Sequence, residues 1–279
     1  MEFIKGENLN SMTAIKVENF SFRYIQANRQ NCGNLGYKQA LENIDFEVSA
    51  GEKISIIGPN GAGKSTLLLN IAGLMDEYFD LKLNNNCGKI FIYGKQINIK
   101  NIYDIRQQIG FVFQNPDDQL FSTSVFEDVA FGLVNFLNKN KDLRANDKDY
   151  IKETVYLTLN KVNLKNKEDE IPHFLSYGEK KLAALATILS YDPEILILDE
   201  PSSNLDPRNR DNFINLIKSL GKTMLISTHD MDLAYEFSER CLIINDGKIV
   251  YDGSTKEILK NKDFLLENGL NLPLAFRNS

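Results

Sequence analysis

Length, composition and charge place this chain among ordinary globular proteins. Its 279 residues are 43% hydrophobic and 25% charged, enough to bury the core of one large domain or two modest ones. The net charge of -6 argues against nucleic acid as the main partner, because a protein that neutralises phosphates needs a basic surface.

Cysteine usage and apolar runs indicate the compartment. Cys32, Cys87 and Cys241 are odd in number, far apart and without metal-binding spacing, which favours a reducing, intracellular setting. The first residues, "MEFIKGENLNSMTAIKV", lack the long apolar core of a signal peptide. No apolar run approaches the roughly 18–20 residues that a bilayer crossing requires. We therefore expect a chain that does not span a membrane by itself.

The first part of the chain predicts strands and a glycine loop. Residues 14–24 and 44–49 alternate apolar and polar positions, as half-buried strands do, and 25–39 between them reads as a long loop. Residues 53–57 predict a buried strand, followed after the glycine loop by a helix over 64–74.

The next part predicts a surface excursion and then helices. Residues 76–88 are polar enough to lie on the surface, and strands are expected around 89–93 and 110–113. From about 115 to 190 the pattern is helical. Ser124 and Glu127 have the spacing of a capping box.

After residue 190, short apolar strands again alternate with helices, which predicts a mainly parallel α/β core with the helical block inserted. Asp246 and Gly247 suit the tight turn of a hairpin, since both tolerate positive φ. A last helix is expected to start at Ser254, with Glu257 in its first turn, and to end near Gly269.

The segment "GPNGAGKST" (58–66) fits the P-loop pattern in full and lies between a strand and a helix. Its glycines let successive amides turn toward the β-phosphate of a nucleotide, Lys64 reaches the β/γ oxygens, and the Ser65 hydroxyl holds Mg²⁺. The alternatives are a glycine-rich turn without ligand and a dinucleotide fingerprint, which Thr66 disfavours because it stands where a third glycine is needed. The predicted nucleotide-binding residues here are Gly58, Asn60, Gly61, Ala62, Gly63, Lys64, Ser65 and Thr66.

Two adjacent acids, Asp199 and Glu200, end the apolar strand "EILILDE". Beside a P-loop, Asp199 is placed to hold Mg²⁺ and Glu200 to orient or deprotonate the attacking water. The alternative is that the pair caps a helix. His229 follows the strand "TMLIST" at a carboxyl end, where α/β sites gather, although a lone histidine can also be a packing or capping residue. His173 is interpreted as structural.

The motifs occur in a diagnostic order: P-loop, Gln114, "LSYGEKK", "ILILDE", "SNLD" and His229. This order resembles the nucleotide-binding domain of ATP-binding cassette (ABC) proteins over nearly the whole chain. The resemblance implies an α/β P-loop NTPase with a mainly parallel core sheet, an antiparallel β subdomain and an inserted helical subdomain. It implies a nucleotide-binding domain over 14–253, with the helical subdomain at about 115–190, and a C-terminal helical extension over 254–279.

The resemblance also assigns roles to single residues. "LSYGEKK" is similar to the ABC signature loop, whose Ser176 and Gly178 would complete the ATP site of a second subunit in a head-to-tail dimer. Gln114 would contact Mg²⁺ or the attacking water, and His229 would bind the γ-phosphate. Ser203 and Asp206 would bridge the dimer, and Tyr24 would stack on adenine, with a plain core aromatic as its alternative.

Some residues depart from the family pattern. Tyr177 stands where the signature loop usually has glycine, Glu179 where it has glutamine, and Leu182 where an arginine is common. Glu179 adds negative charge to the first turn of the helix, which helps the helix but not a nearby phosphate. We expect a working loop that is weaker than usual in the partner's site.

The segment "FVFQNPDDQLFSTSVFEDVAFGLVNF" (111–136) is similar to ATPases of energy-coupling factor (ECF) importers. Its apolar side chains are too many to point inward together, so some of them are expected to line a groove for a helix of a membrane subunit. The alternative is an aromatic subdomain core. The side chains are Leu120, Phe121, Val125, Phe126 and Phe131.

The function implied is the ATP-hydrolysing subunit of an ECF-class importer that takes up a metal ion or vitamin and binds ATP and Mg²⁺. Its expected place is the cytoplasmic face of the membrane. Its expected partners are a second ABC ATPase, identical or related, a transmembrane coupling subunit and a substrate-binding membrane subunit, with no nucleic acid. The alternatives are a soluble ABC ATPase that acts on nucleic acid or ribosomes, and a nucleotide-dependent assembly module of low turnover.

Overall fold

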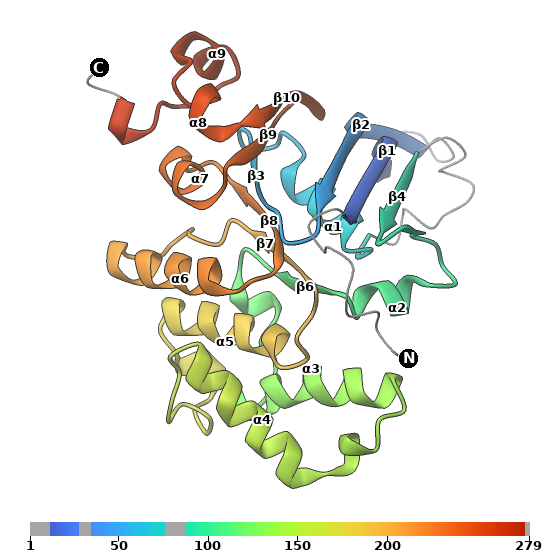
Figure 1. Cartoon of the computed structure of the whole chain (residues 1–279), viewed down its shortest axis with the longest axis vertical. Coiled ribbons are helices and arrows are strands. Elements are labelled where there is room, and N and C mark those ends of the chain that lie inside the picture. Colours follow the sequence, from blue (N-terminus) through green and yellow to red (C-terminus); the bar gives the residue numbers. More distant parts are fainter. Residues whose placement is uncertain (1–11, 28–34, 76–87, 277–279) are drawn as a thin grey trace. The chain divides into compact units, whose positions relative to one another are not determined.

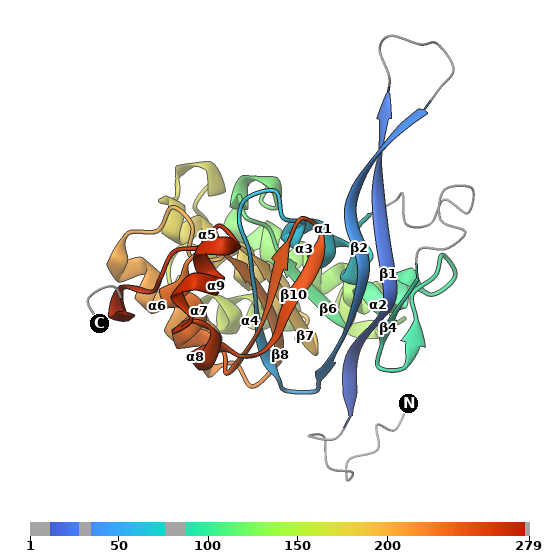
Figure 2. The ribbon, with the colours of Figure 1, turned by 90° about the horizontal axis from the view of Figure 1, so that it is seen from above.

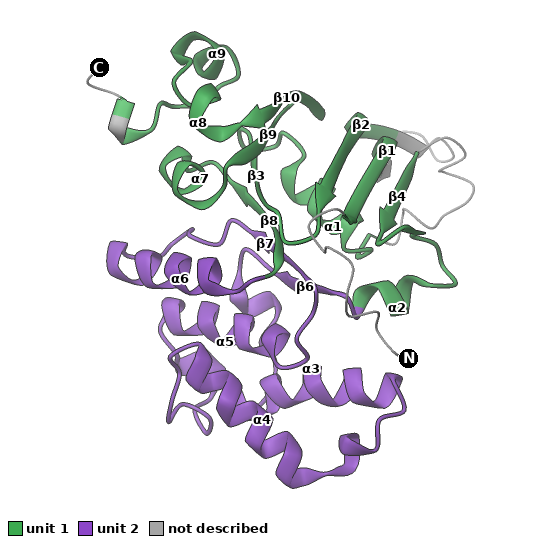
Figure 3. Ribbon diagram, viewed as in Figure 1, with its two compact units in different colours: residues 1–106, 222–279 green, residues 107–221 purple. Residues whose placement is uncertain are grey.

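The computed structural model describes residues 12–27, 35–75 and 88–276 (Figure 1). Cys32, Cys87 and nearly all of the predicted excursion at 76–88 lie outside these residues. The chain divides into two compact units, drawn in two colours in Figure 3. Unit 1 comprises residues 1–106 and 222–279, and unit 2 comprises residues 107–221.

Unit 1 contains an antiparallel sheet with the strand order β2-β1-β4-β5. Its strands are β1 (Thr13–Ala27), β2 (Leu35–Ser49), β4 (Lys89–Ile92) and β5 (Lys95–Gln96). The predicted loop over 25–39 was wrong at both ends, because β1 and β2 remain paired out to Ala27 and Leu35 (Figure 2). Main-chain hydrogen bonds to a partner strand hold this part of the hairpin, and they do not require the apolar alternation used to predict strands.

The second sheet segment of unit 1 surrounds β3 (Lys53–Ile57). This strand pairs in parallel with β8 (Thr223–Thr228) and β9 (Arg240–Asn245). β10 (Lys248–Ser254) returns antiparallel to β9 through the predicted turn, with φ of 46° at Asp246 and 74° at Gly247. β8 is buried along its whole length and β3 from Ile54 onward, as expected for parallel strands covered on both faces.

The helices of unit 1 follow these strands. They are α1 (Lys64–Ile71), α2 (Ile102–Arg106), α7 (Met231–Phe237), α8 (Thr255–Ile258) and α9 (Lys262–Glu267), with a 3₁₀ turn η6 (Leu274–Phe276). The last predicted helix is in fact two. The side chain of Asn261 accepts a hydrogen bond from the Phe264 amide, so it caps a new helix instead of continuing the old one.

Unit 2 contains two parallel strands, β6 (Ile109–Val112) and β7 (Ile195–Asp199), and the longest of the described helices. The helices are α3 (Val125–Lys139), α4 (Lys148–Lys161), α5 (Tyr177–Leu189) and α6 (Pro207–Ser219). Short 3₁₀ turns are η3 (Pro116–Asp118), η4 (Leu143–Asn146) and η5 (Pro172–Phe174). Among the residues that the structure describes, no helix has the length and apolar character needed to cross a bilayer.

The predicted capping box at Ser124 forms only in part. The Ser124 hydroxyl accepts the Glu127 amide at 3.2 Å, as expected. The Glu127 carboxylate, however, accepts from the amide and hydroxyl of Thr123 instead of the Ser124 amide. The two donors of Thr123 thus compete with the Ser124 amide for the Glu127 carboxylate.

Candidate functional site

The predicted site residues fall into two groups, one in each unit. In unit 1, the glycine loop connects β3 to α1, and Gly63 takes the N-cap position of α1 with φ of 108°. A Cβ at Gly63 would lie 2.8 Å from the Ala40 carbonyl oxygen and 2.9 Å from Leu41 Cδ2. Glycine is therefore required both by the backbone angle and by the close approach of β2. Gly63 makes no side-chain hydrogen bond to the first amides of α1, and the start of a helix attracts anions.

Lys64 lies inside this loop. Its side chain is largely buried, and its Nζ donates to the carbonyl oxygens of Gly58 at 2.8 Å and Pro59 at 3.2 Å. The loop thus holds a positive charge next to the amide-rich start of α1. This is the arrangement that a phosphate chain requires.

Tyr24 lies beside the glycine loop, as its predicted role requires. Its hydroxyl hydrogen-bonds the Thr66 hydroxyl on α1 at 2.9 Å. Its ring meets Phe22 edge to face, with the ring centroids 5.2 Å apart. The side chain is half-buried, so the contact with α1 and the packing on Phe22 are both part of its environment.

His229 joins the same group because of strand pairing. β8 runs parallel to β3, and Thr228 is the register partner of Ile57, the residue before Gly58. His229 and the glycine loop therefore leave the sheet at the same edge, and His229 is exposed there. Asp230 turns the chain into α7 by accepting the amides of Asp232 and Leu233.

In unit 2, Asp199 and Glu200 end β7 and are only 7% and 6% exposed. Glu200 has φ of 46°, a left-handed conformation that is uncommon for a residue with a side chain and that concentrates at functional sites. The suggestion that this pair caps a helix is wrong, because Asp206 caps the next helix, α6. Two buried acids at the carboxyl end of a strand are costly unless they serve a charged group.

Gln114 and Glu200 follow the ends of neighbouring strands. Val112 on β6 and Leu198 on β7 are register partners, so both polar side chains lie just beyond one edge of the pair. Gln114 is exposed. The expected grouping of Gln114 with Asp199 and Glu200 is therefore consistent with the strand pairing.

The signature-like loop differs from the expectation in its hydrogen bonding. Ser176 caps α5 in a complete capping box with Glu179. The Ser176 amide and hydroxyl both donate to Glu179 Oε2 at 2.9 Å, and Lys167 Nζ lies 3.2 Å from Oε1. The Ser176 amide and hydroxyl and Lys167 lower the pKa of Glu179, against the effect of burial. The donors of Ser176 that were expected to face a phosphate are thus engaged by a carboxylate of the same helix.

Gly178 lies where α5 approaches α6. A Cβ at this position would lie 3.2 Å from the side-chain amide of Asn209. The two residues also line a pocket of about 240 Å³ next to the loop, together with Lys165, Lys167, Glu179 and Asn212 among others.

Two further functional candidates are Tyr177, which the sequence marked only as a departure from the family pattern, and Lys181, which the motifs did not single out. The Tyr177 hydroxyl donates to the Gln114 carbonyl at 3.1 Å, and the Tyr177 ring centroid lies 5.7 Å from Lys181 Nζ. Lys181 is fully buried, and its Nζ donates to the Glu200 carbonyl at 3.0 Å. Burial lowers the pKa of Lys181 to about 8, although Asp199 and Glu200 act in the opposite direction. A lysine on the apolar face of "KKLAALATIL" was the signal available in the sequence.

The apolar residues of 120–131 separate into two sets. Leu120 and Val125 are buried, whereas Phe121 is 69% and Phe131 53% exposed, and their rings meet edge to face at 5.1 Å. Phe126 is half-buried next to Tyr156. Exposed paired aromatics of this kind are typical of an interaction surface.

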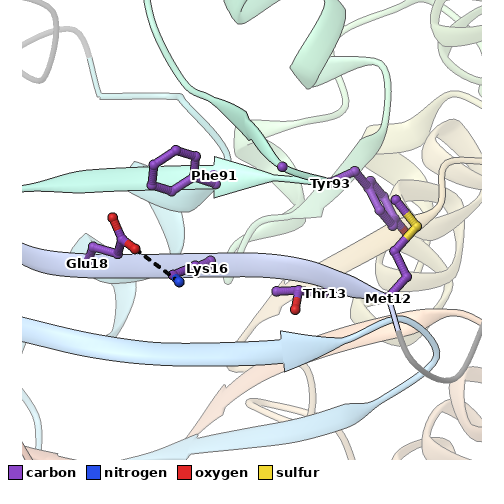
Figure 4. Close-up of a pocket in the computed structure, with 7 residues that line it drawn as sticks. Met12, Thr13, Lys16, Glu18, Phe91 and Tyr93 are labelled. Atoms are coloured by element: carbon purple, nitrogen blue, oxygen red, sulfur yellow. Dashed lines mark ion pairs between the residues drawn. The ribbon is translucent and has the colours of Figure 1, made fainter.

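A further pocket, of about 350 Å³, lies on β1 and β4 (Figure 4). Its floor carries the Lys16–Glu18 ion pair at 3.0 Å, and Phe91 and Tyr93 form its aromatic side. None of the predicted site residues lines it.

Comparison with known proteins identifies the family. The ABC transporter family model matches residues 41–203. The energy-coupling factor transporter ATP-binding protein EcfA of Carboxydothermus hydrogenoformans is 39% identical over 268 residues, which cover 95% of this chain and 89% of that protein. A putative ABC transporter ATP-binding protein of Streptomyces coelicolor is 41% identical over 238 residues, 85% of each chain.

Solved structures agree with the sequence relatives. The structure of cbiO1 from Clostridium perfringens, described as part of the ABC transporter complex cbiONQ, has a TM-score of 0.73 and 32% identity and covers 96% of this chain and 99% of that one. The ATP-binding cassette MJ0796, solved as a dimer in a post-hydrolysis state with ADP and Pi, has a TM-score of 0.72 and 26% identity and covers 86% of this chain and 98% of that one. The predicted fold class is therefore confirmed. By family model, relatives and fold, this chain belongs to the ABC transporter family, as one of its ATP-binding and ATP-hydrolysing proteins.

Proposed function

We propose that this chain is the ATP-hydrolysing subunit of an ECF-class importer for a metal ion or vitamin, bound to the cytoplasmic face of the membrane through a transmembrane subunit. The observation that carries the proposal is the 39% identity with EcfA over 95% of this chain. The fold similarity to cbiO1, described as part of a transporter complex, supports it. The net charge of -6 and these transporter relatives leave the nucleic-acid and ribosome alternative without support.

The glycine loop is assigned to the phosphates of ATP. The amides at the start of α1 and Lys64 would bind the β- and γ-phosphates, and Tyr24 would stack on the adenine from its place beside Thr66. Mg²⁺ suits the oxygen donors of Ser65, Gln114 and Asp199, which are the hard ligands that this ion takes. When bound, the ion would neutralise charge that develops on the phosphate oxygens.

Hydrolysis is assigned to Glu200 and His229. A water oxygen attacks the γ-phosphorus, the bond from that phosphorus to the bridging oxygen breaks, and ADP and inorganic phosphate result. Glu200 would accept the proton of the water, and His229 would bind the γ-phosphate. The buried position of Glu200 favours this role, because packing around the side chain holds the carboxylate in a fixed place, as a general base requires.

The second half of each ATP site is assigned to another ABC ATPase in a head-to-tail dimer. The dimeric state of MJ0796 supports this arrangement. In this chain the Ser176 donors are bound to Glu179, which favours a related partner whose own signature loop serves the glycine loop of this chain. Ser203 and Asp206 are assigned to the dimer interface, and residues 14–253 to the nucleotide-binding domain.

The central test is Glu200→Gln in the assembled ATPase dimer. We expect ATP binding to be retained and turnover to fall by about a hundredfold or more, because the proton acceptor is lost. The dimer should persist in the presence of ATP, as size-exclusion chromatography would show. Glu194→Gln, a carboxylate at the opposite end of β7, is the matched control and should leave turnover unchanged. Wild-type hydrolysis by Glu200→Gln would remove Glu200 from its role.

A further inference from the structure

We propose that Lys181 is a positioning residue for Glu200: its ammonium binds the main-chain carbonyl of Glu200 and so maintains the left-handed backbone from which the Glu200 carboxylate projects. The inference rests on the proposed function, because it explains how the assigned proton acceptor is held. It adds a residue in α5 to the hydrolytic machinery.

Glu200 requires such support. The φ of 46° at Glu200 is unfavourable for a residue with a side chain, since its Cβ crowds the neighbouring backbone, so contacts that hold this conformation stabilise the site. The Glu200 carbonyl accepts hydrogen bonds from the Ser203 amide at 3.1 Å, the Ser203 hydroxyl at 2.8 Å and Lys181 Nζ at 3.0 Å. The two donors of Ser203 belong to the same turn, whereas Lys181 comes from a separate helix. Lys181 therefore connects this turn to α5 through a hydrogen bond.

The burial of Lys181 indicates that its ammonium serves to make an interaction and not to fill space. It is among the largest fully buried side chains, and lysine is almost never fully buried unless it is paired. A methionine would fill the same space without the cost of removing a charge from water. The ammonium instead reaches the Glu200 carbonyl and, at 3.5 Å, the Ser203 hydroxyl. Attraction between Lys181 and the carboxylates of Asp199 and Glu200 offsets part of the cost of burial.

Tyr177 extends this arrangement to the segment after β6. Its ring lies next to the Lys181 ammonium, with 5.7 Å from Nζ to the ring centroid, and its hydroxyl donates to the Gln114 carbonyl. The tyrosine that departs from the family's glycine thus contacts both the positioning lysine and the backbone of a predicted site residue. Gln114, Tyr177, Lys181 and Glu200 form one continuous set of contacts within unit 2.

The test compares two variants of Lys181 in the ATPase dimer. Lys181→Met keeps the side chain as far as Cε but lacks the ammonium and cannot donate a hydrogen bond, whereas Lys181→Arg retains the charge and the N–H donors. We expect Lys181→Met to lower kcat by about tenfold with KM for ATP within about twofold, because chemistry and not nucleotide binding depends on Glu200. Lys181→Arg should keep kcat within about threefold of the wild type, because a guanidinium N–H can donate to the same carbonyl.

Three further measurements distinguish a positioning role of Lys181 from an effect of its substitution on folding. The midpoint of thermal unfolding should fall in Lys181→Met, because Asp199 and Glu200 lose a buried positive charge, so kcat is compared well below that midpoint, where the variant is folded. Lys180→Met, one residue earlier, is the matched control, because Lys180 Nζ pairs with Asp117 at 2.7 Å and not with Glu200. It should leave kcat within about twofold of the wild type. Binding of a fluorescent ATP analogue should be the same in all three variants.

Unchanged kcat in Lys181→Met would overturn the inference, and so would a loss of kcat in both Lys181 variants accompanied by a lower unfolding midpoint. If Lys181→Met does not fold, Lys181→Leu, which also lacks a donor, takes its place: a loss of kcat of about tenfold supports the inference and an unchanged kcat overturns it. Glu200→Gln, measured in parallel, distinguishes a failure of the proposed function from a failure of the role proposed for Lys181. An active Glu200→Gln contradicts the proposed function, whereas an inactive Glu200→Gln beside a fully active Lys181→Met contradicts only the role of Lys181.

Discussion

Ser176 illustrates how one neighbouring residue changes what a loop can bind. Its amide and hydroxyl point to Glu179, a residue that was expected only to add charge near a phosphate. In the structure Glu179 itself takes the place of an anion at the start of α5. A phosphate of a partner's ATP would have to compete with this carboxylate for the same donors.

Glu179→Gln tests this competition. Glutamine preserves the capping box but removes the charge, so we expect tighter ATP-dependent dimerisation, by about two- to fivefold. Analytical ultracentrifugation with ATP would measure it. Lys165→Gln, on the same pocket but outside the capping box, serves as the charge-change control. Dimerisation that weakens in Glu179→Gln would show that the carboxylate assists the loop.

The pH dependence of this cap has a defined sign. The folded-state pKa of Glu179 lies below its ordinary value of 4.5, chiefly because the Ser176 amide donates to the carboxylate. The cap therefore contributes stability that is complete above pH 4.5 and is lost as pH falls through the lower, folded-state pKa. Denaturant titrations of the wild type and Glu179→Gln should accordingly differ at neutral pH and converge in acid. A constant difference across this range would contradict the assignment.

Two variants of Tyr24 distinguish the two roles predicted for its ring, stacking on adenine and packing in the core. Tyr24→Phe loses the hydrogen bond to Thr66 but retains the aromatic face, whereas Tyr24→Ala loses both. If the ring stacks on adenine, ATP affinity should fall by about threefold to tenfold in Tyr24→Ala and stay within about twofold in Tyr24→Phe. Equal affinity in both variants would identify Tyr24 as a structural aromatic. Equilibrium titration with ATP at constant Mg²⁺ provides the measurement.

At the scale of the elements, the approach to α3 and its first turns separate into a buried and an exposed face. Leu120 and Val125 join the core, and Phe121 and Phe131 remain exposed as a pair. Both aromatics are attached to well-packed neighbours, so the pair has a defined shape that another helix could fit. We assign this pair to the contact with the transmembrane subunit.

Phe121→Asp and Phe131→Asp test that contact. Each places a charge on the exposed face without affecting the core, so co-purification with the transmembrane subunit should be lost while ATPase activity of the dimer persists. Leu143→Asp is the matched control, because Leu143 is also an exposed apolar residue of unit 2 but lies on η4. Retention of the membrane partner in both phenylalanine variants would exclude this surface.

At the scale of the whole molecule, the C-terminal extension is part of a core and not an appendage. Leu265 and Leu270 share a buried cluster with Ile57 at the end of β3 and Met231 at the start of α7. The Leu274 amide donates to Asp232 Oδ1 at 2.8 Å, and the rings of Tyr235 and Phe276 meet edge to face. The extension therefore supports the elements that carry the glycine loop and His229 in unit 1.

Leu270→Ala measures that support. Removing a buried leucine side chain should lower the free energy of unfolding by about 2–4 kcal/mol. Leu266→Ala, 55% exposed in α9, should change it by less than about 0.5 kcal/mol. Chemical denaturation of the two variants would compare them. Equal stability would mean that the extension is dispensable for unit 1.

Local backbone requirements determined much of this protein from sequence alone. Gly61, Gly63 and Gly247 take positive φ at little cost because they lack a side chain, so the glycine loop and the β9–β10 turn could be predicted without knowledge of their neighbours. The order of motifs then identified the family, and the alternation of strands and helices the fold class.

Only the tertiary structure decided which side chains meet. The sequence predicted Glu200 but not the lysine that binds its carbonyl, because Lys181 lies 19 residues earlier and becomes buried only when α5 packs beside β7. It likewise left open which of Leu120, Phe121, Val125 and Phe131 point to the core. Burial depends on contacts with elements that are distant in the sequence, and a local pattern carries no information about these contacts.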